Sequence, residues 1–231
     1  MAPFQRDTNL LLSTQASDGI LCLTLNDPIR RNALSEEMLA VLGEAFEAAS
    51  DNAAVRVIIL AATGQVFCAG HDLKEITTGR KSVDRGRAYF TKILNQCSFV
   101  MQKIVTCPKP VIAEIDGVAT AAGCQLVASC DLAVASETAQ FCTPGVHIGL
   151  FCSTPMVALS RNLANKHAME MLLTGAKISA LRAAEMGLVN QVVPSAELRA
   201  ASRAMAKEIA EKSSLTVATG KRAFYQQKEM D

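Results

Sequence analysis

The sequence predicts an α/β fold, and three observations lead to that prediction. Five strand-like runs alternate with helical patterns over most of the chain, which is typical of a sheet flanked by helices. Half of the 231 residues are hydrophobic, enough to build a sizeable buried core. Strand-like runs then cease near Pro194, and only helical patterns follow. The five runs are 19–27, 55–63, 109–117, 130–137 and 187–193.

Helices are predicted between these runs and after them. Residues 34–50 place hydrophobic side chains on one face, and Ser35 is the expected N-cap. Residues 83–107 form a long helical pattern that Pro108 ends, and 179–187 form a short one closed by a glycine. We therefore divide the chain into a core, residues 1–194, and a helical C-terminal region, residues 195–231.

Composition argues against several classes of partner. The chain has 23 basic and 22 acidic residues, no Trp and only two Tyr, which does not favour nucleic acid. No apolar run is long enough to cross a membrane. The eight cysteines form no Cys-x-x-Cys and do not cluster with the three histidines, so we expect reduced thiols and neither disulfides nor a metal site. The first residues lack a signal or transit pattern, and we expect a cytoplasmic protein.

Two stretches of small residues lead from a strand toward a helix. They are "GQVFCAGHDLKE" at 64–75 and "ATAAGCQLVASCD" at 119–131. The first N–H groups of a helix lack partners within it, and a pair of N–H groups aimed at one point can stabilise an oxyanion. The alternative is structural, since Gly64 and Gly70 suit ordinary turns and Ala121–Gly123 suits close helix packing.

These motifs resemble the enoyl-CoA hydratase/isomerase, or crotonase, family in order and spacing over nearly the whole chain. The resemblance implies a crotonase (ClpP-like) spiral of repeated ββα units, followed by C-terminal helices that build a homotrimer or a dimer of trimers. It also implies an acyl-CoA thioester as ligand, without a further cofactor, and a C-terminal region that is incomplete here by about one helix. The segments that carry it are 26–35, 67–75, 109–136, 141–150 and 174–194.

The resemblance assigns residues to the ligand. The thioester carbonyl would lie between the N–H groups of His71 and Ala122. Ala121 and Ala122 replace the family's common Gly-Gly, but a backbone donor survives such a change. Guanidinium groups suit the phosphates of coenzyme A, although the two arginines also fit a solvated turn. The residues expected along the adenosine and pantetheine portions are Arg30, Arg31, Ala33, Ala69, Asp72 and Leu73.

The sequence departs from the family at both catalytic acids. Hydratases of the family use two glutamates, and the matching positions here hold Gln125 and Gly145. An amide hydrogen-bonds water but does not take its proton near neutral pH. Standard hydration is therefore disfavoured. A subgroup of the family resembles this chain in lacking the acid pair.

Other residues were considered for acid–base or nucleophilic work. The His71 side chain could titrate near pH 7, and Cys124 at a helix start could have a lowered pKa. The alternatives are a structural histidine and a packing thiol. His147 is more readily explained as a loop residue, and Cys152, Ser153 and Thr154 are expected to line the acyl site. Structural caps or surface charges are expected for Asp72, Glu75, Glu114, Asp116 and Asp131.

Two functions follow. The first is an acyl-CoA enzyme that uses the oxyanion hole for isomerisation, thioester hydrolysis or weak hydration. The second is an acyl-CoA-binding protein without catalysis.

Overall fold

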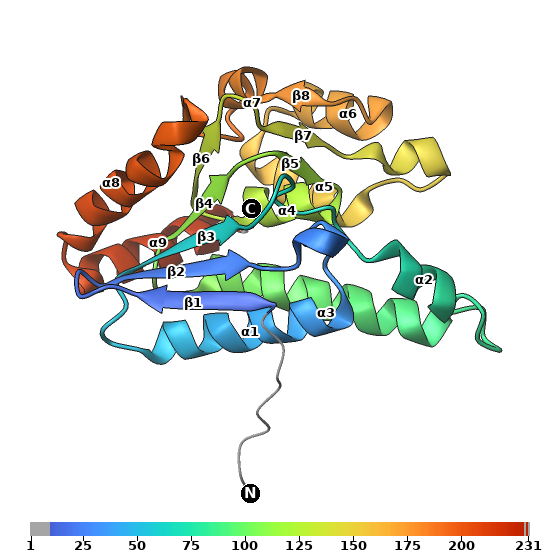
Figure 1. Cartoon of the computed structure of the whole chain (residues 1–231), viewed down its shortest axis with the longest axis horizontal. Helices are drawn as coiled ribbons and strands as arrows, with labels where there is room; N and C mark the ends of the chain where they lie inside the picture. The colour runs from blue at the N-terminus through green and yellow to red at the C-terminus, as the bar shows by residue number, and fades with distance from the viewer. Residues whose placement is uncertain (1–9, 229, 231) are drawn as a thin grey trace, which may run out of the picture.

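A six-stranded sheet forms the centre of the computed structural model, which describes residues 10–228 and 230 (Figure 1). Its order is β1-β2-β3-β4-β6-β9. β1 pairs antiparallel with β2, and every other neighbouring pair is parallel. The strands are Leu11–Gln15, Ile20–Leu25, Val57–Ala62, Val111–Ile115, Leu132–Ser136 and Gln191–Val193. The five predicted strands are all confirmed, with shorter bounds.

Both faces of this sheet are covered, because its side chains alternate. Leu21, Leu23 and Leu25 of β2 pack on the side of α1 (Glu36–Asp51) and α3 (Arg87–Thr106), which lie side by side below the sheet in Figure 1. The intervening residues of β2 and β3 face α8 (Leu198–Ala210) on the opposite side. Strand side chains point to opposite faces in turn, so near-continuous hydrophobic strands suit a sheet buried on both sides.

The ends of α1 and α3 show which local sequence signals were sufficient to predict a helix boundary. Ser35 caps α1 as predicted, since its Oγ accepts a hydrogen bond from the Met38 N–H at 3.1 Å. α3 also ends before Pro108, but it begins four residues later than the pattern indicated. Gly86 precedes it with φ +88°, and Asp84 accepts from the N–H groups of Gly86 and Ala88. This turn separates α3 from the residues before it.

A second sheet of three short strands lies beside the first. β5 (Val118–Thr120) pairs with β7 (Gln140–Cys142), which pairs with β8 (Ile178–Ser179). These three strands were missed from the sequence, because two or three residues give no measurable period, and the five-residue β1 was missed as well. α4 (Ala122–Ser129) follows β5 almost at once, so the second sheet sets where α4 begins.

Five further helices and three short 3-10 turns complete the described part of the chain. α7 was predicted and ends at Gly187, whose φ is +90°. α5 and α6 were not predicted. The bounds are α2 Leu73–Gly79, α5 Ser153–Asn162, α6 Asn165–Thr174, α7 Ala180–Met186 and α9 Ser214–Lys228, with short 3-10 turns η1 Pro28–Arg30, η2 Pro144–Ile148 and η3 Ser195–Glu197.

A buried lysine fastens α9 to the rest of the chain. The Lys221 side chain is 8% exposed, and its Nζ lies 2.6 Å from Asp131 Oδ2. Nζ also donates to the carbonyl oxygens of Ile104 and Lys109, the first of which belongs to the last turn of α3. Tyr225 donates to the other Asp131 oxygen at 3.0 Å. A cation at a helix C-terminus interacts favourably with the helix dipole, so this contact orients α9 against α3.

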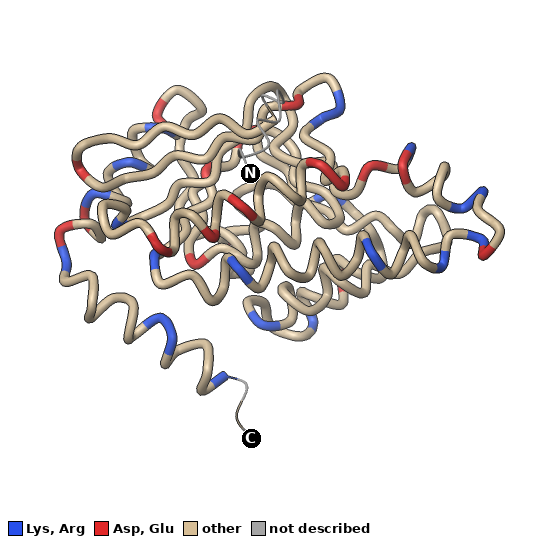
Figure 2. The backbone as a smooth tube through the Cα atoms, turned by 90° about the horizontal axis from the view of Figure 1, so that it is seen from below, with Lys and Arg blue, Asp and Glu red and all other residues tan. Residues whose placement is uncertain are grey.

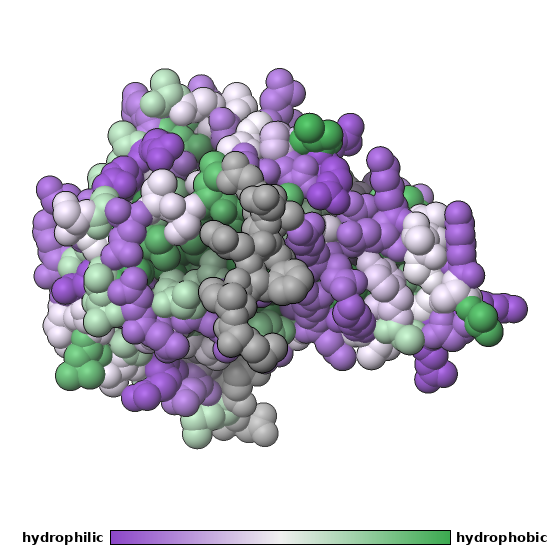
Figure 3. Space-filling view, turned by 60° about the horizontal axis from the view of Figure 1, so that its bottom comes forward, coloured by the Kyte–Doolittle hydropathy of each residue, from purple (hydrophilic) through white to green (hydrophobic). Residues whose placement is uncertain are grey.

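Figure 2 shows basic and acidic positions interspersed along the backbone, and the face in Figure 3 mixes hydrophilic with hydrophobic side chains. Among the residues that the structure describes, no helix is both long and apolar enough to cross a membrane.

Candidate functional site: a junction of two backbone turns

The two small-residue stretches meet in space. Cys68 donates its N–H to the Val118 oxygen at 3.2 Å and accepts from the Thr120 N–H at 3.0 Å, which forms a short parallel bridge with β5. Ala121 at the end of β5 donates to the Cys142 oxygen at 2.9 Å. The turn before α2 and the turn before α4 are therefore held by backbone hydrogen bonds. We call this place the junction, residues 68–72 and 119–122.

Two glycines allow the junction to close. A Cβ added to Gly123 would lie 2.8 Å from the Cys68 carbonyl carbon and closer still to its oxygen. A Cβ added to Gly70, whose φ is +81°, would lie 3.1 Å from the Ala122 nitrogen. Real Cβ atoms essentially never approach as closely as at Gly123, and the contact at Gly70 would be tighter than most. The structural alternative considered for these glycines is thus confirmed, and it is also what brings the two turns together.

Ala121 adopts a backbone conformation that disfavours alanine. Its φ is +51° and its ψ −120°, a region populated almost entirely by glycine. A non-glycine residue held there costs on the order of 1–3 kcal/mol. The hydrogen bond to Cys142 and the start of α4 maintain this conformation. Strained residues of this kind cluster at functional sites.

Two N–H groups remain available at the junction. In the described part of the chain, neither the His71 N–H nor the Ala122 N–H is assigned a backbone acceptor, whereas the Gly70 oxygen accepts from Leu34 at 2.7 Å. Ala122 is the first residue of α4, where an N–H has no partner within the helix. The arrangement can hold one acceptor atom, and an anion there would meet the positive end of the helix dipole.

The His71 ring is buried and neutral. Both ring nitrogens are shielded from solvent and lack a hydrogen-bond partner of good geometry among the described residues. Burial lowers the pKa of His71 below its ordinary value of 6.5, and the Leu34 backbone only partly opposes this. The ring is therefore uncharged at neutral pH, whichever nitrogen carries the proton.

Gln125 lies on α4, three residues after Ala122. Its side chain is almost fully buried, with 6% of the residue exposed. Its Oε1 has no hydrogen-bond partner among the described residues. Burying an amide oxygen without a partner costs free energy. Gln125 also lines a cavity of about 440 Å³ between α3, α4, α5 and α9.

Gly145 does not leave an empty place for an acid. It is buried in η2, and a Cβ there would lie 2.8 Å from Cys152 Sγ and even closer to the Leu150 oxygen. Leu150 donates its N–H to the Gly145 oxygen at 2.9 Å. The Leu150 carbonyl therefore lies in the space that a side chain at position 145 would need. The sequence pattern did not indicate this close contact.

The cysteines at the site are inert packing groups. Cys124 is completely buried, and burial raises its thiol pKa above the ordinary value, with smaller contributions from Cys142 and Cys152. Burial raises the pKa of Cys152 as well. A helix N-terminus lowers a thiol pKa only when the thiolate is partly solvated, so the lowered pKa considered for Cys124 is wrong.

The cavity that Gln125 lines has a mainly apolar surface. Thr154 lines it, as expected from the sequence, together with Leu94 and Met101 of α3. Its volume of about 440 Å³ falls in the range of small-ligand sites. Gln125 connects it with the first turns of α4. His147 lies elsewhere, exposed on η2 with its Nε2 beside Gly175, which fits the loop role expected for it.

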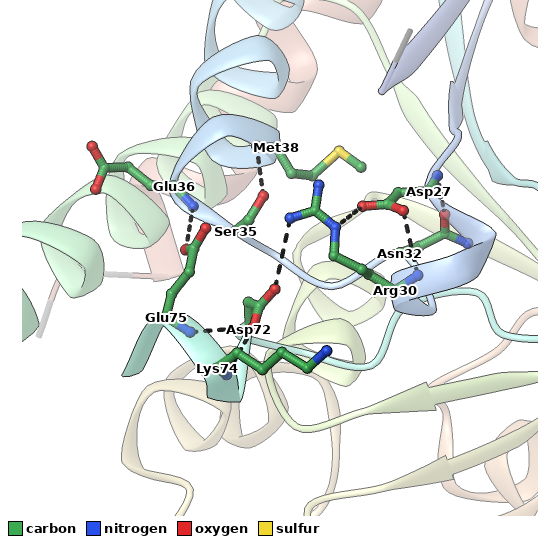
Figure 4. A network of polar contacts seen from close by, with 9 residues as sticks. All are labelled: Asp27, Arg30, Asn32, Ser35, Glu36, Met38, Asp72, Lys74 and Glu75. Atoms are coloured by element: carbon green, nitrogen blue, oxygen red, sulfur yellow. Dashed lines mark hydrogen bonds and ion pairs between the residues drawn. The ribbon is translucent and has the colours of Figure 1, made fainter. Parts of the chain in front are cut away.

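The two adjacent arginines differ in their surroundings, and Figure 4 shows the contacts of Arg30. Arg30 is committed to carboxylates, since its Nε lies 2.6 Å from Asp27 Oδ2 and its Nη1 3.9 Å from Asp72 Oδ2. Arg31 is exposed, with φ +57°. Asp72 caps α2 by accepting from the Lys74 and Glu75 N–H groups. Of the other residues expected along the ligand, Ala33 is buried, Ala69 half-buried and Leu73 exposed.

Asn32 is an organising residue that the sequence reasoning missed. It is fully buried, its φ is +50°, and its Oδ1 accepts from the Asp27 N–H at 2.8 Å. Its Nδ2 donates to the oxygens of Thr63 and Val66 at 2.9 and 2.7 Å. Asparagine tolerates this left-handed conformation better than most residues. That tolerance was a signal within "RRNALS", and it fixes the loop that carries Arg31.

The acidic residues have the structural roles expected of them. Glu75 accepts from the Glu36 N–H and the Tyr89 hydroxyl, and Glu114 from Ser202. Asp116 accepts from Ser136, and Asp131 pairs with Lys221. Among residues 10–228 and 230, no group of three or more His, Cys, Asp or Glu is arranged to hold a metal ion.

Comparisons with known proteins agree with this architecture. A family model described as enoyl-CoA hydratase/isomerase matches residues 15–231. Enoyl-CoA hydratase domain-containing protein 3 of Rattus norvegicus is 48% identical over 221 residues, covering 96% of this chain and 72% of the relative. The Homo sapiens protein of that name is 48% identical over 219 residues, covering 95% and 71%.

Solved structures give the same result. An enoyl-CoA hydratase of Mycobacterium smegmatis has a TM-score of 0.92 and 50% identity, covering 97% of this chain and 85% of that one. Human enoyl-coenzyme A hydratase domain-containing protein 3 has a TM-score of 0.90 and 47% identity, covering 96% and 86%. The predicted crotonase fold is therefore confirmed, as is the resemblance to enoyl-CoA hydratase domain-containing protein 3 within the family.

The cytoplasmic location expected from the sequence is contradicted. The rat, mouse and human relatives are all named as mitochondrial proteins. Near-zero net charge and reduced thiols are compatible with more than one compartment, so they could not establish the location. The fold, the matched residues and the relatives together lead to one conclusion: this chain belongs to the enoyl-CoA hydratase/isomerase family.

Proposed function

We propose that this protein binds acyl-CoA thioesters and polarises their carbonyl group between the N–H groups of His71 and Ala122. One observation carries the proposal. Two backbone turns from distant parts of the sequence meet, and each leaves an N–H without an assigned acceptor in the described chain. A pair of fixed donors stabilises the charge that develops on a carbonyl oxygen.

The coenzyme A portion extends from the junction toward the Arg31 loop. Arg31 is the arginine that meets a phosphate, because Arg30 is already paired with Asp27 and Asp72. Ala33, Ala69 and Leu73 line the path beside the adenosine. The Ala69 N–H donates to the Arg31 oxygen at 3.1 Å. This hydrogen bond fixes the position of the Arg31 loop relative to the junction.

The acyl group enters the cavity beside Gln125. No carboxylate stands at either position that a hydratase would use, and Gly145 has no room for one. The reaction is therefore one that uses a polarised thioester, such as isomerisation, thioester hydrolysis or weak hydration. His71 supplies one of the two N–H donors, and its neutral ring can also accept a proton.

A second candidate is acyl-CoA binding without turnover. A specific observation favours it: Gln125, Gly145 and the buried Cys124 thiol supply no acid or base at the junction. Both candidates require the same donor pair, and they differ in whether bound thioester is converted.

A matched pair of ligands tests the donor pair. Octanoyl-CoA and S-octyl-CoA, a thioether, differ only in the carbonyl oxygen, and the thioester should bind about tenfold more tightly by calorimetry. Equal affinity would contradict the proposal. Mass spectrometry of unsaturated, saturated and hydroxylated acyl-CoAs after incubation then separates the two candidates, because only an enzyme changes them.

We also propose that the protein forms a homotrimer or a dimer of trimers. Exposed hydrophobic residues on and beside η2 and α6 support this, since contiguous apolar surface often marks an interface. Ile148, Leu150 and Leu173 are 68%, 61% and 59% exposed. Light scattering after size-exclusion chromatography should give three or six times the monomer mass, and a monomer at micromolar concentration would exclude it.

A further inference from the structure

The connection between α2 and α3 carries a concentration of positive charge. We call residues 79–87 the basic turn, because they hold four of the chain's 23 basic residues and one of its 22 acidic residues. The basic turn therefore has a formal charge of +3, whereas the whole chain has +1. Figures 1 and 2 both show it at one end of the molecule. Its basic residues, all of them exposed, are Arg80, Lys81, Arg85 and Arg87.

Hydrogen bonds to one carboxylate fix the shape of the basic turn. Asp84 accepts from the Ser82 hydroxyl at 2.6 Å. It also accepts from the N–H groups of Gly86 and Ala88 at 3.0 and 2.8 Å. A Cβ added to Gly86, whose φ is +88°, would lie 3.1 Å from the Arg80 Cα, so the two ends of the turn are in contact. The basic side chains are thus gathered by a folded structure.

The four cations of the basic turn are free to meet a partner. In the part of the chain that the structure describes, none of their side chains forms an ion pair or a hydrogen bond. Several basic residues elsewhere are paired, as Lys92 is with Glu36. Asp84 does not pair with the cations of the turn, because its oxygens accept hydrogen bonds from Ser82 and the backbone.

A hydrophobic side chain is exposed among these cations. Val83, near the middle of the basic turn, is fully exposed to solvent. A single exposed apolar residue is common, so Val83 is informative only together with the charges around it. At an anionic lipid surface, basic side chains meet the headgroup phosphates, and an apolar side chain enters the boundary between headgroups and acyl chains. Exposed cations around an exposed valine match these two layers.

From this geometry we propose that the basic turn docks the protein on a membrane that contains anionic lipids. The arginine guanidinium groups bind lipid phosphates, which each can contact through two N–H groups at once, and Val83 enters the boundary below them. The rest of the chain has two more acidic than basic residues, which favours an orientation with the basic turn toward the membrane. This docking goes beyond acyl-CoA binding and does not depend on it.

A lipid surface fits the basic turn better than a protein or a nucleic acid does. A stable protein interface buries about 800 Å² on each partner and involves about 20–30 residues a side, whereas the turn has nine residues. Single-stranded nucleic acid is bound with the help of aromatic side chains on which bases stack, and the turn contains none. A fluid lipid surface requires neither, because its phosphates can move to the cations.

Vesicle sedimentation with the full chain tests the proposal. At about 0.05 M sodium chloride, phosphatidylcholine vesicles with about a quarter phosphatidylglycerol should bind the protein about tenfold more tightly than vesicles of phosphatidylcholine alone. At about 0.5 M sodium chloride this preference should disappear, because the Debye length falls to about 4 Å.

Two variants with the same change in net charge locate the effect. Neutralising the basic turn should abolish the preference for anionic vesicles, since each basic residue near such a surface contributes about fivefold. Neutralising four exposed basic residues outside α2 and α3 should preserve it. Val83→Ser should weaken binding to anionic vesicles about threefold. The turn variant carries Arg80→Gln, Lys81→Gln, Arg85→Gln and Arg87→Gln, and the control variant carries Lys166→Gln, Lys177→Gln, Arg199→Gln and Lys207→Gln.

Each outcome decides a part of the proposal. Equal binding of the unaltered protein to both kinds of vesicle overturns it, and this comparison holds even if a variant fails to fold. Equal loss in the turn and control variants also overturns it, since net charge would then be the cause. Binding of an octaglutamate peptide without binding of anionic vesicles assigns the turn to an acidic protein partner and overturns lipid docking. Unchanged vesicle binding by Val83→Ser overturns the role of Val83.

Discussion

The junction and the η2 region differ in how well their proposed chemistry survives the replacement of a side chain. In the proposed site the junction contributes two backbone N–H groups, and the side chains of Ala121 and Ala122 leave both groups in place. The η2 region depends on a side chain in hydratases, and here Gly145 lacks that side chain while the Leu150 oxygen fills the space. A site built from backbone tolerates side-chain replacement, whereas acid–base chemistry does not.

Gly123→Ala should have the largest effect, because it forces the two turns of the junction apart. The added Cβ would meet Cys68 backbone atoms, which are fixed by hydrogen bonds on both sides. We expect a loss of about 3 kcal/mol in the free energy of unfolding, measured with urea, and loss of acyl-CoA binding. Gly220→Ala in α9 is the control: it meets open space and should stabilise by about 0.5–1 kcal/mol. Similar results for both would show that the junction is not tightly packed.

Gly145→Ala should have a smaller effect of the same kind. The Cβ meets the Leu150 oxygen and Cys152 Sγ, but Leu150 is exposed and can shift. We expect a loss of about 2 kcal/mol in urea unfolding. Gly145→Glu should lose at least as much, so restoring both acids with Gln125→Glu should produce no hydratase activity. If a well-folded double variant lowered the absorbance of an enoyl-CoA substrate, the predicted lack of room for a glutamate at Gly145 would be contradicted.

The buried His71 ring should make stability depend on pH below 6.5. Its pKa is lowered in the folded state, so the unfolded chain binds more protons between the two pKa values. Stability is therefore fully present above about pH 6.5 and falls as the pH drops toward the folded pKa, with a slope of at most about 1.4 kcal/mol per pH unit. His71→Gln should remove this contribution, as measured by urea unfolding between pH 5 and 7. If the variant's unfolding free energy depended on pH as that of the unaltered protein does, the burial of the His71 ring would be contradicted.

Ala121→Gly should have the smallest effect and the opposite sign. Relief of the strain at φ +51° outweighs the entropy that glycine loses on folding, and we expect a gain of up to about 1 kcal/mol. Ala119→Gly, at a regular strand position of β5, is the control and should destabilise. A thermal shift of the same sign in both variants would refute the strain at Ala121.

Particular elements show how far local sequence signals reach. The Ser35 cap, the Pro108 end of α3 and the Gly187 end of α7 were predicted because each depends on one or two neighbouring residues. β5, β7 and β8 were missed because they exist only through pairing with one another. The compartment was also predicted wrongly: the expectation rested on the lack of a transit pattern in the first residues, whereas the relatives are named as mitochondrial. The division at Pro194 stays a prediction, although α8 packs directly on the main sheet.

The sequence by itself determined the α/β class, the family, the position of both donor segments and the absence of the two acids, since each depends on residue identity and order. Only the tertiary structure decided which of two adjacent arginines is available, that burial neutralises His71 and raises the Cys124 pKa, and that no room exists at Gly145. These properties depend on charge partners, solvent exclusion and close contacts between segments distant in the chain. None of these is encoded in a local pattern, because each arises when the turns meet.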